Sequence, residues 1–367
     1  MPTSSKIAET AFRLGCGRYI QESGALHRIG EEILLLNRKK PYIIGGEKAL
    51  LLTQNLIRKS LAQQHLEGIF YTYTGFCCKE TCEILIESPD FQGCDVVIGV
   101  GGGNIMDAAK YCAGKANLPV INVPTSSATC AAFTPLSVCY NRKGQTVGSI
   151  HHKKEVNKVI VDMDILCRQP VRLLVAGIYD SLAKLYEINQ RLLGTNLDDV
   201  DIGLAASYQM SRYACEFLNR KKAECIADVA AGRLTKTVYD VVYITMALTG
   251  VISGLARGSN QCAIAHKVYE VSRTLFPKEV YSVLHGELVA IGLIAQIAYN
   301  QEISITPEQF AIEMRELKMP TTLHELGIPV DENVLQSYYD KIVTSSAMAG
   351  TNDGERKKLR CVLQRIL

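Results

Sequence analysis

The stretch VIGVGGGNIMDAAK, Val97–Lys110, joins an apolar, β-branched run to a helical pattern through three consecutive glycines. It departs from the G-x-G-x-x-G pattern of dinucleotide-binding turns, because Asn104 stands where the third glycine should be. Gly101, Gly102 and Gly103 carry no Cβ atom, so a ligand can approach their backbone closely. The helix that follows would offer free N–H groups and a partial positive charge, which suit a pyrophosphate. Taken alone, the stretch fits a phosphate site and a tight turn without a ligand equally well.

Short apolar runs alternate with helical patterns around this stretch, which predicts a parallel α/β sheet covered on both faces. The runs expected to be strands are 41–46, 68–75, 94–100, 118–124, 136–141 and 158–163. After Cys167 the pattern becomes helical, with helices expected at 179–192, 198–218, 236–256, 261–276, 285–300 and 307–317. The sequence therefore predicts an α/β, Rossmann-like domain over residues 1–166 and an all-helical domain over residues 167–367.

Bulk composition limits the classes of protein to which the chain can belong. Its 367 residues are 47% hydrophobic and 21% charged, as in an ordinary globular protein. A net charge of +3 with scattered basic residues argues against a nucleic-acid partner. The longest uncharged apolar run, Val241–Ala256, is shorter than the roughly 20 residues of a membrane span, so we expect a buried core helix and no membrane partner.

The cellular compartment is inferred from the N-terminus and the cysteines. The polar start MPTSSKIAET has no apolar segment typical of a signal peptide. The 13 cysteines form no C-x-x-C pair, so buried thiols in a reducing cytoplasm are expected.

A second loop, residues 123–141, follows the next predicted strand and is rich in hydroxyl groups. Its hydroxyl residues include Thr125, Ser126, Ser127, Thr129 and Thr134. A parallel sheet gathers such loops at the carboxyl ends of its strands, where ligands bind. Turn and cap chemistry is the alternative, and it accounts for two or three of these hydroxyls more easily than for all of them.

Three side chains in the helical half are candidate metal ligands. They are Asp180, His266 and His285, each in a helical segment with otherwise apolar surroundings. Two histidines and a carboxylate can hold a divalent ion and leave a coordination position open for a substrate. Spacing does not show that the three converge, and a single histidine of this kind is more often a core residue with a hydrogen-bond partner.

Several motifs in the same order resemble the group III metal-dependent (iron-containing type) alcohol dehydrogenases. The matching segments are the glycine turn, the loop ATCAAFTPLSVCYN, and the segments GIYDSLAK, AHKVYE, HGELVAIG and LKMPTTLHELGI. The similarity covers nearly the whole chain and is strongest to the glycerol dehydrogenase-like branch, including hydroxycarboxylate dehydrogenase A-like oxidoreductases. It implies the dehydroquinate synthase-like fold that this family shares.

The resemblance also implies an activity and its cofactors. A family member transfers hydride between NAD or NADP and a small alcohol or carbonyl substrate, here a 2-hydroxy or 2-oxo acid or a polyol such as glycerol. One divalent ion, zinc or iron, is expected in a cleft between the domains, and a homo-oligomer is expected.

Carried over residue by residue, the resemblance assigns roles at matching positions. Asp180, His266 and His285 become the metal ligands. The cofactor phosphate turn takes Gly101, Gly102, Gly103 and Asp107, and the second loop takes Thr125, Thr134, Leu136 and Tyr140.

Three positions depart from the pattern of glycerol dehydrogenases. Cys130 stands where those enzymes have an aspartate near the polyol, which argues against glycerol; a buried, inert thiol is expected there. Lys184 lies one helical turn after Asp180 and could meet a substrate carboxylate, or could simply pair with an acid. Tyr269 replaces a histidine and either supplies a hydroxyl near the site or packs.

The cofactor type depends on the residue after the strand at 41–46. Gly46 aligns with the acidic position that holds the ribose 2′-hydroxyl in NAD-preferring relatives. Without a carboxylate there, a 2′-phosphate is not repelled and Lys48 could attract it, so NADP is favoured. Glu47 points the other way, so NAD stays open.

Two other functions fit the same architecture. A dehydroquinate synthase-like lyase would need several basic residues around the cleft to bind a phosphorylated substrate. Here Lys184 is one such residue, and Arg257 is a second candidate. A catalytically degenerate, nucleotide-binding relative is suggested by Cys130 and Tyr269 and opposed by the intact Asp180, His266 and His285.

Overall fold

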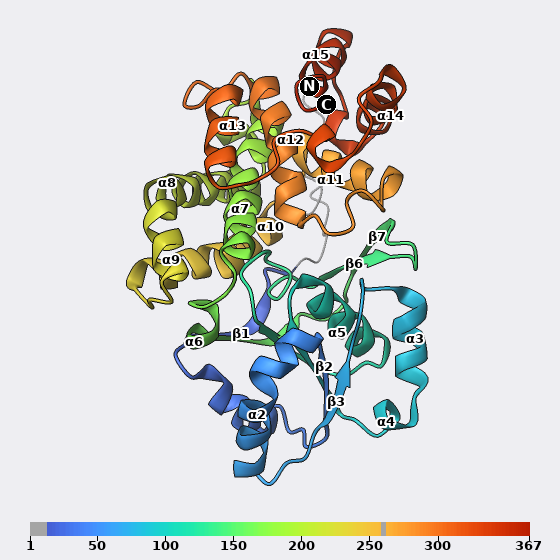
Figure 1. Ribbon diagram of the computed structural model, residues 1–367, viewed down its shortest axis with the longest axis vertical. Coiled ribbons are helices and arrows are strands. Elements are labelled where there is room, and N and C mark those ends of the chain that lie inside the picture. Colours follow the sequence, from blue (N-terminus) through green and yellow to red (C-terminus); the bar gives the residue numbers. More distant parts are fainter. Residues whose placement is uncertain (1–12, 258–261) are drawn as a thin grey trace.

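The computed structural model describes residues 13–257 and 262–367 of the chain. An α/β half, blue to green in Figure 1, lies against a helical half that is yellow-green to red. All strands of the described chain lie between Cys16 and Asp162, and helices fill the rest. The predicted fold class is therefore confirmed, and solved structures described below share it. The division into two domains at residue 166 stays a prediction.

The main sheet has six parallel strands in the order β1-β8-β5-β4-β2-β3. Their bounds are β1 (Cys16–Glu22), β2 (Pro41–Gly45), β3 (Ile69–Thr72), β4 (Val96–Gly101), β5 (Val120–Pro124) and β8 (Val156–Asp162). The central strands β2, β4 and β5 are buried along their whole length, which is why the sequence shows them as continuous apolar runs.

Helices cover both faces of this sheet. They are α1 (Ile29–Leu34), α2 (Glu47–Gln63), α3 (Lys79–Glu87), α4 (Pro89–Gln92), α5 (Gly103–Lys115) and α6 (Met163–Leu166). One core lies between the sheet and α1 and α2. The other core begins under α3 and α5 and continues without a break into the helical half. The two halves therefore share buried side chains.

A separate hairpin of β6 (Leu136–Tyr140) and β7 (Thr146–His151) leaves the α/β half and contacts the helical half. The sequence predicted β6 but missed β7 and β1. Every residue of β7 is exposed or half-buried, and in β1 only Ile20 is buried. Neither strand therefore shows the apolar run or the regular alternation by which strands are recognised.

The helical half holds nearly all of the predicted helices, with shifted ends. Its helices are α7 (Val171–Leu192), α8 (Ile202–Ala230), α9 (Lys236–Tyr243), α10 (Thr249–Leu255), α11 (Ile264–Leu275), α12 (His285–Asn300), α13 (Pro307–Glu316), α14 (Glu332–Val343) and α15 (Asp353–Leu363). Helices α14 and α15 were not predicted; in α15 six of the eleven residues are charged, which leaves little apolar pattern.

The apolar run predicted as one helix at 236–256 is α9, a π-helical turn (Ile244–Leu248) and α10 in succession. By length and composition alone, Lys236–Leu255 could cross a membrane, but 61% of its most apolar window is buried inside the protein. That burial agrees with the core helix expected from the sequence.

Gly177 in α7 sets how closely the helical half approaches the loop after β5. A Cβ atom at this position would lie 1.9 Å from the carbonyl oxygen of Ser127. The same loop is held by Gln169, whose Oε1 accepts the backbone N–H of Ser127 at 2.8 Å. Glycine is therefore needed at 177 for the loop to rest directly on the helix.

We expect Gly177→Ala to destabilise the protein by about 1–3 kcal/mol, because the methyl group must displace backbone atoms. The matched control is Gly93→Ala, where an added Cβ has no neighbour within 4 Å. Thermal unfolding should show a midpoint lowered by several degrees for the first variant and unchanged for the second. Equal midpoints for the two variants would contradict the close contact.

Candidate metal and dinucleotide site

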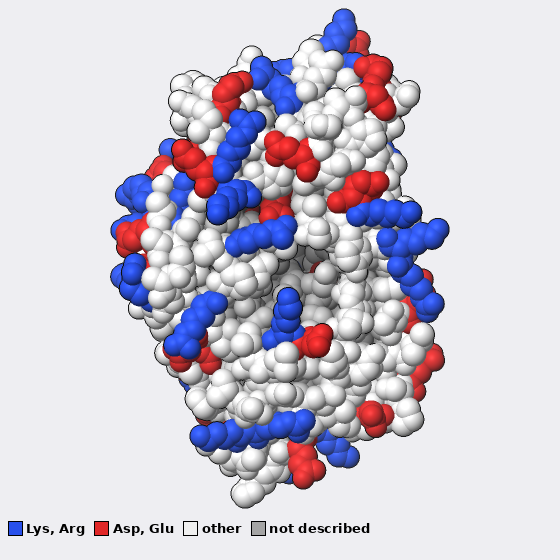
Figure 2. All heavy atoms as spheres, viewed as in Figure 1, with Lys and Arg blue, Asp and Glu red and all other residues white. Residues whose placement is uncertain are grey.

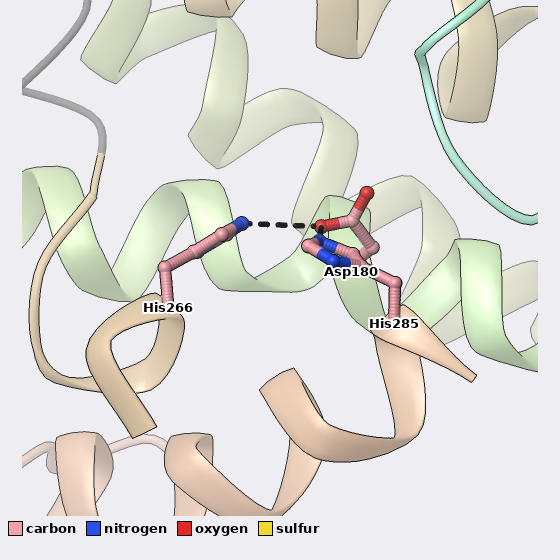
Figure 3. Close-up of side chains that lie close together, drawn as sticks. All are labelled: Asp180, His266 and His285. Carbon is pink, nitrogen blue, oxygen red and sulfur yellow. Dashed lines mark ion pairs between the residues drawn. The ribbon is translucent and has the colours of Figure 1, made fainter. Parts of the chain in front are cut away.

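Three side chains from three helices of the helical half meet at one point. Asp180 comes from the middle of α7, His266 from the first turn of α11, and His285 is the first residue of α12. Asp180 Oδ1 lies 3.4 Å from Nε2 of His266 and 3.3 Å from Nε2 of His285. Figure 3 shows both imidazole rings pointing toward this carboxylate. Convergence, which spacing could not show, is thus a property of the fold.

The orientation of His266 is fixed by Glu187, two turns further along α7. Its Oε2 accepts the Nδ1 hydrogen of His266 at 2.5 Å, and its Oε1 accepts the backbone N–H groups of Ala263 and His266. Nε2 of His266 is therefore turned toward Asp180. Glu187 was not among the residues predicted from the sequence, although its i+7 spacing from Asp180 places both on one helix face.

The donor set fits a divalent metal ion. One ligand atom from each of Asp180, His266 and His285 lies within 4.8 Å of the others. Oδ1 of Asp180 is buried and accepts no well-formed hydrogen bond from the described residues. A buried carboxylate oxygen needs a partner, and a metal ion among two imidazoles would supply one. Glu187 supplies the carboxylate behind a histidine ligand that metal sites commonly contain.

Lys184 lies against this cluster as a buried cation. Its Nζ is 3.4 Å from Nε2 of His266, and its side chain is almost fully enclosed. Burial is the largest single effect and opposes the charge, but the nearby Asp180 and Glu187 carboxylates, with the thiols of Cys130 and Cys262, together raise the pKa of the lysine above its ordinary value. The ammonium group is therefore charged at neutral pH.

Cys130 lies near Asp180 and Lys184, on the loop after β5. Burial and the nearby Asp180 charge raise the pKa of its thiol to about 11. The thiol is thus protonated and uncharged at neutral pH, as an inert cysteine would be.

The glycine turn lies where β4 passes into α5. Gly101 has φ +153°, and Gly102 is the N-cap of α5, with the helix beginning at Gly103. A Cβ atom on Gly103 would lie 3.1 Å from Oγ1 of Thr129, so the turn and the hydroxyl-rich loop are in contact. The backbone N–H of Thr125 donates to the carbonyl oxygen of Gly101 at 3.0 Å. Both predicted loops therefore meet at the carboxyl ends of β4 and β5.

Gly46 adjoins this turn from the next strand. It is the N-cap of α2, and its N–H donates to the carbonyl oxygen of Val100 at 3.2 Å. Its φ of −72° and ψ of 148° suit any residue, and an added Cβ would meet Ile105 at an ordinary 3.7 Å. The position can therefore accept a side chain without strain.

Asp107 and Lys110 form a buried ion pair, 2.9 Å between Oδ1 and Nζ. Oδ2 of Asp107 accepts the backbone N–H of Val138. The Lys110 ammonium donates to the carbonyl oxygens of Ala131, Thr134 and Leu136. This ion pair therefore fixes the second loop to α5 through hydrogen bonds to its backbone. Direct cofactor contacts of Asp107, Thr134 and Leu136 stay predictions.

Tyr140 and Tyr269 join the α/β half to a metal-ligand candidate. Their hydroxyl groups lie 2.6 Å apart in a buried hydrogen bond. The Tyr269 ring packs edge-on against His285, with 4.2 Å between ring centroids. The Tyr269 ring thus packs against His285 and its hydroxyl is bound to Tyr140; a role for that hydroxyl at the site stays a prediction.

Figure 2 shows a hollow near the middle of one face, between the helical half and the α/β half. Acidic and basic side chains lie along its rim. On this side of the molecule, the space between the two halves is therefore open to solvent.

Comparisons with known proteins agree with this architecture. Residues 16–163 match the sequence model of a family described as iron-containing alcohol dehydrogenase. The resemblance to the iron-containing alcohol dehydrogenases is confirmed.

Several known dehydrogenases are similar to this protein over most of the chain. Hydroxycarboxylate dehydrogenase A of Escherichia coli is 29% identical over 334 residues, 90% of this chain and 88% of that protein. Glycerol dehydrogenase of Thermotoga maritima is 28% identical over 327 residues, 85% of this chain and 84% of that protein. The crystal structure of glycerol dehydrogenase from Schizosaccharomyces pombe superposes with a TM-score of 0.80 at 25% identity, covering 97% of this chain and 91% of that one. These relatives support a metal-dependent oxidoreductase.

We expect Glu187→Gln to weaken binding of a divalent ion by about 10- to 100-fold, because an amide cannot accept all three N–H groups that Glu187 holds. Titration of metal-stripped protein with Zn²⁺ would measure this dissociation constant. Glu316→Gln, an exposed residue of α13, is the matched control and should bind as the unaltered protein does. An unchanged constant for Glu187→Gln would contradict the assigned orientation of His266.

Proposed function

We propose that this protein transfers hydride between NADP(H) and a small hydroxy or carbonyl compound, using a divalent ion held by Asp180, His266 and His285. The observation that carries the proposal is the convergence of these three side chains around a buried carboxylate oxygen that accepts no well-formed hydrogen bond. Two nitrogen ligands and one oxygen ligand suit either Zn²⁺ or Fe²⁺.

The dinucleotide would bind along the carboxyl ends of β2, β4 and β5. The N-terminus of α5 provides N–H groups for the pyrophosphate, and the glycine turn lets the phosphates approach. Gly46 would face the ribose, and the loop that carries Thr125, Thr134 and Leu136 would face the rest of the cofactor. That loop rests on α7, the helix of Asp180, which supports a nicotinamide placed beside the metal ligands.

The protein's own contribution to the reaction is positioning and exclusion of water. When bound, the metal ion supplies Lewis-acid polarisation of an alcohol or carbonyl oxygen. Glu187 accepts a hydrogen bond from Nδ1 of His266 and so holds the ring hydrogen on that nitrogen. Nε2 then stays available as a ligand. Tyr269 packs against His285 and limits its movement. Burial of Asp180 and His266 keeps water from these groups, which strengthens the electrostatic interactions of the site.

The lyase and the degenerate relative are less well supported. A phosphorylated substrate would call for several cations at the metal ligands, whereas the cation packed against them is Lys184. A degenerate relative would have no need of a carboxylate that orients His266. A homo-oligomer, a cytoplasmic location and a small-molecule substrate accompany the proposal as predictions.

We expect His285→Ala to lose its bound metal and to reduce turnover by several orders of magnitude. Purified protein, reconstituted with Zn²⁺ or Fe²⁺, would be assayed for NADPH and NADH oxidation with 2-oxo acids, aldehydes and dihydroxyacetone. His324→Ala, an exposed histidine of the C-terminal region, is the control and should keep both metal and activity. Full activity in His285→Ala would overturn the proposed site.

We expect Gly46→Asp to shift cofactor preference toward NADH. A carboxylate at this position would repel the 2′-phosphate of NADPH and accept the 2′-hydroxyl of NADH. The kcat/KM for NADPH should fall roughly tenfold or more relative to that for NADH. Gly46→Asn, similar in size but neutral, is the control and should change the ratio much less. If both variants behave alike, the ribose does not lie at Gly46.

A further inference from the structure

Lys184 occupies an unusual place for an ammonium group. It lies one turn after Asp180 on α7, is 4% exposed, and has its Nζ 3.4 Å from Nε2 of His266. It takes part in none of the ion pairs formed by the described residues, and its one hydrogen-bonding contact among them is this imidazole nitrogen. A buried cation without an ion-pair partner is costly to keep in a fold.

That single contact cannot persist in the metal-loaded protein. The Nδ1–H of His266 donates a hydrogen bond to Glu187. The other ring nitrogen, Nε2, therefore carries no hydrogen and offers one lone pair. A metal ion held by His266 takes this lone pair. Lys184 is then left without an acceptor among the described residues, next to a candidate metal ligand.

Charge balance leads to the same conclusion. The cluster holds two buried carboxylates, Asp180, which is itself a candidate ligand, and Glu187 behind His266, and a divalent ion held here would draw on both of their charges. The Lys184 ammonium then remains as a surplus positive charge. Cys130 does not neutralise it, because its nearby thiol is protonated at neutral pH. A neutral polyol would leave this charge buried and uncompensated, whereas a carboxylate would neutralise it.

We propose that Lys184 binds the carboxylate of a 2-oxo or 2-hydroxy acid and thereby selects anionic substrates. This inference rests on the proposed function and names its substrate class. In the reductive direction, hydride from NADPH forms a C–H bond at C2, the C2 oxygen gains a proton from water, and NADPH is oxidised to NADP⁺. Lys184 forms no covalent bond and orients the acid by a charge-assisted hydrogen bond.

The test compares two aldehydes that differ in one group, glyoxylate with a carboxylate and glycolaldehyde with a hydroxymethyl group. The metal-loaded protein should reduce glyoxylate with the higher kcat/KM. In Lys184→Met, the ratio of the glyoxylate to the glycolaldehyde value should fall about 10- to 100-fold, as expected for loss of a charged hydrogen bond. Lys184→Arg keeps the charge and should retain more of the ratio than Lys184→Met.

A binding measurement gives a readout independent of turnover. Oxamate, an unreactive analogue of a 2-oxo acid, should bind the metal-loaded protein and bind Lys184→Met at least roughly tenfold more weakly. Metal content is measured on each variant. If Lys184→Met loses its metal, Lys184 supports the metal site instead and the inference is wrong. If that variant does not fold, Lys184→Gln, which keeps a polar end, replaces it.

The outcomes separate the inference from the proposed function. If the unaltered, metal-loaded protein reduces neither aldehyde nor any other carbonyl compound in the screen, the proposed function fails. If it reduces glycolaldehyde at least as well as glyoxylate, or if Lys184→Met leaves the ratio unchanged, the assignment of Lys184 fails and the dehydrogenase function stands.

Discussion

Glu187 is fully buried, and its carboxylate holds the ring of His266 together with two backbone N–H groups at the start of α11. This contact ties α7 to α11, two of the three helices that carry candidate ligands. A buried carboxylate is unfavourable unless its oxygens are satisfied, and here three N–H groups satisfy them. The rest of the site depends on this arrangement, because it fixes both the direction of Nε2 and the distance of α11 from Asp180.

The loop after β5 is held by a comparable arrangement in the α/β half. Lys110 is buried in α5 and binds three carbonyl oxygens of the loop after β5, while Asp107 balances its charge. The loop therefore keeps an irregular path without regular secondary structure, since its carbonyl groups find a donor inside the protein. In both halves, a buried charged side chain binds backbone groups that have no partner within a helix or strand: Glu187 binds N–H groups and Lys110 binds carbonyl oxygens.

The sequence was most informative where burial is uniform. Strands β2, β4 and β5 and helix α12 are buried along most of their length, and their apolar runs predicted them closely. Strands β1 and β7 were not predicted, because their own sequences lack an apolar run. They are strands because they pair with neighbouring strands. The three candidate ligands were predicted, largely by resemblance to known enzymes. Their convergence was not predictable, because it depends on how α7, α11 and α12 cross.

Glu187 shows the same limit at a single residue. Its spacing from Asp180 places it on the right face of α7, but a glutamate on a helix is ordinary in any sequence. Its role appears only when α11 packs against α7 and brings an imidazole nitrogen within 2.5 Å. The residues that orient a site are harder to predict than those that form it, because their partners lie far away in the chain.

The hydrogen bond between Tyr140 and Tyr269 has a mechanical consequence. One phenol belongs to the hairpin of the α/β half and the other to α11, beside His285. Drawing the halves apart here would break this hydrogen bond, which is worth about 0.5–1.5 kcal/mol. The protein is therefore braced next to its candidate metal ligands. At this hydrogen bond, the lengths of the Tyr140 and Tyr269 side chains set the distance between the hairpin and α11.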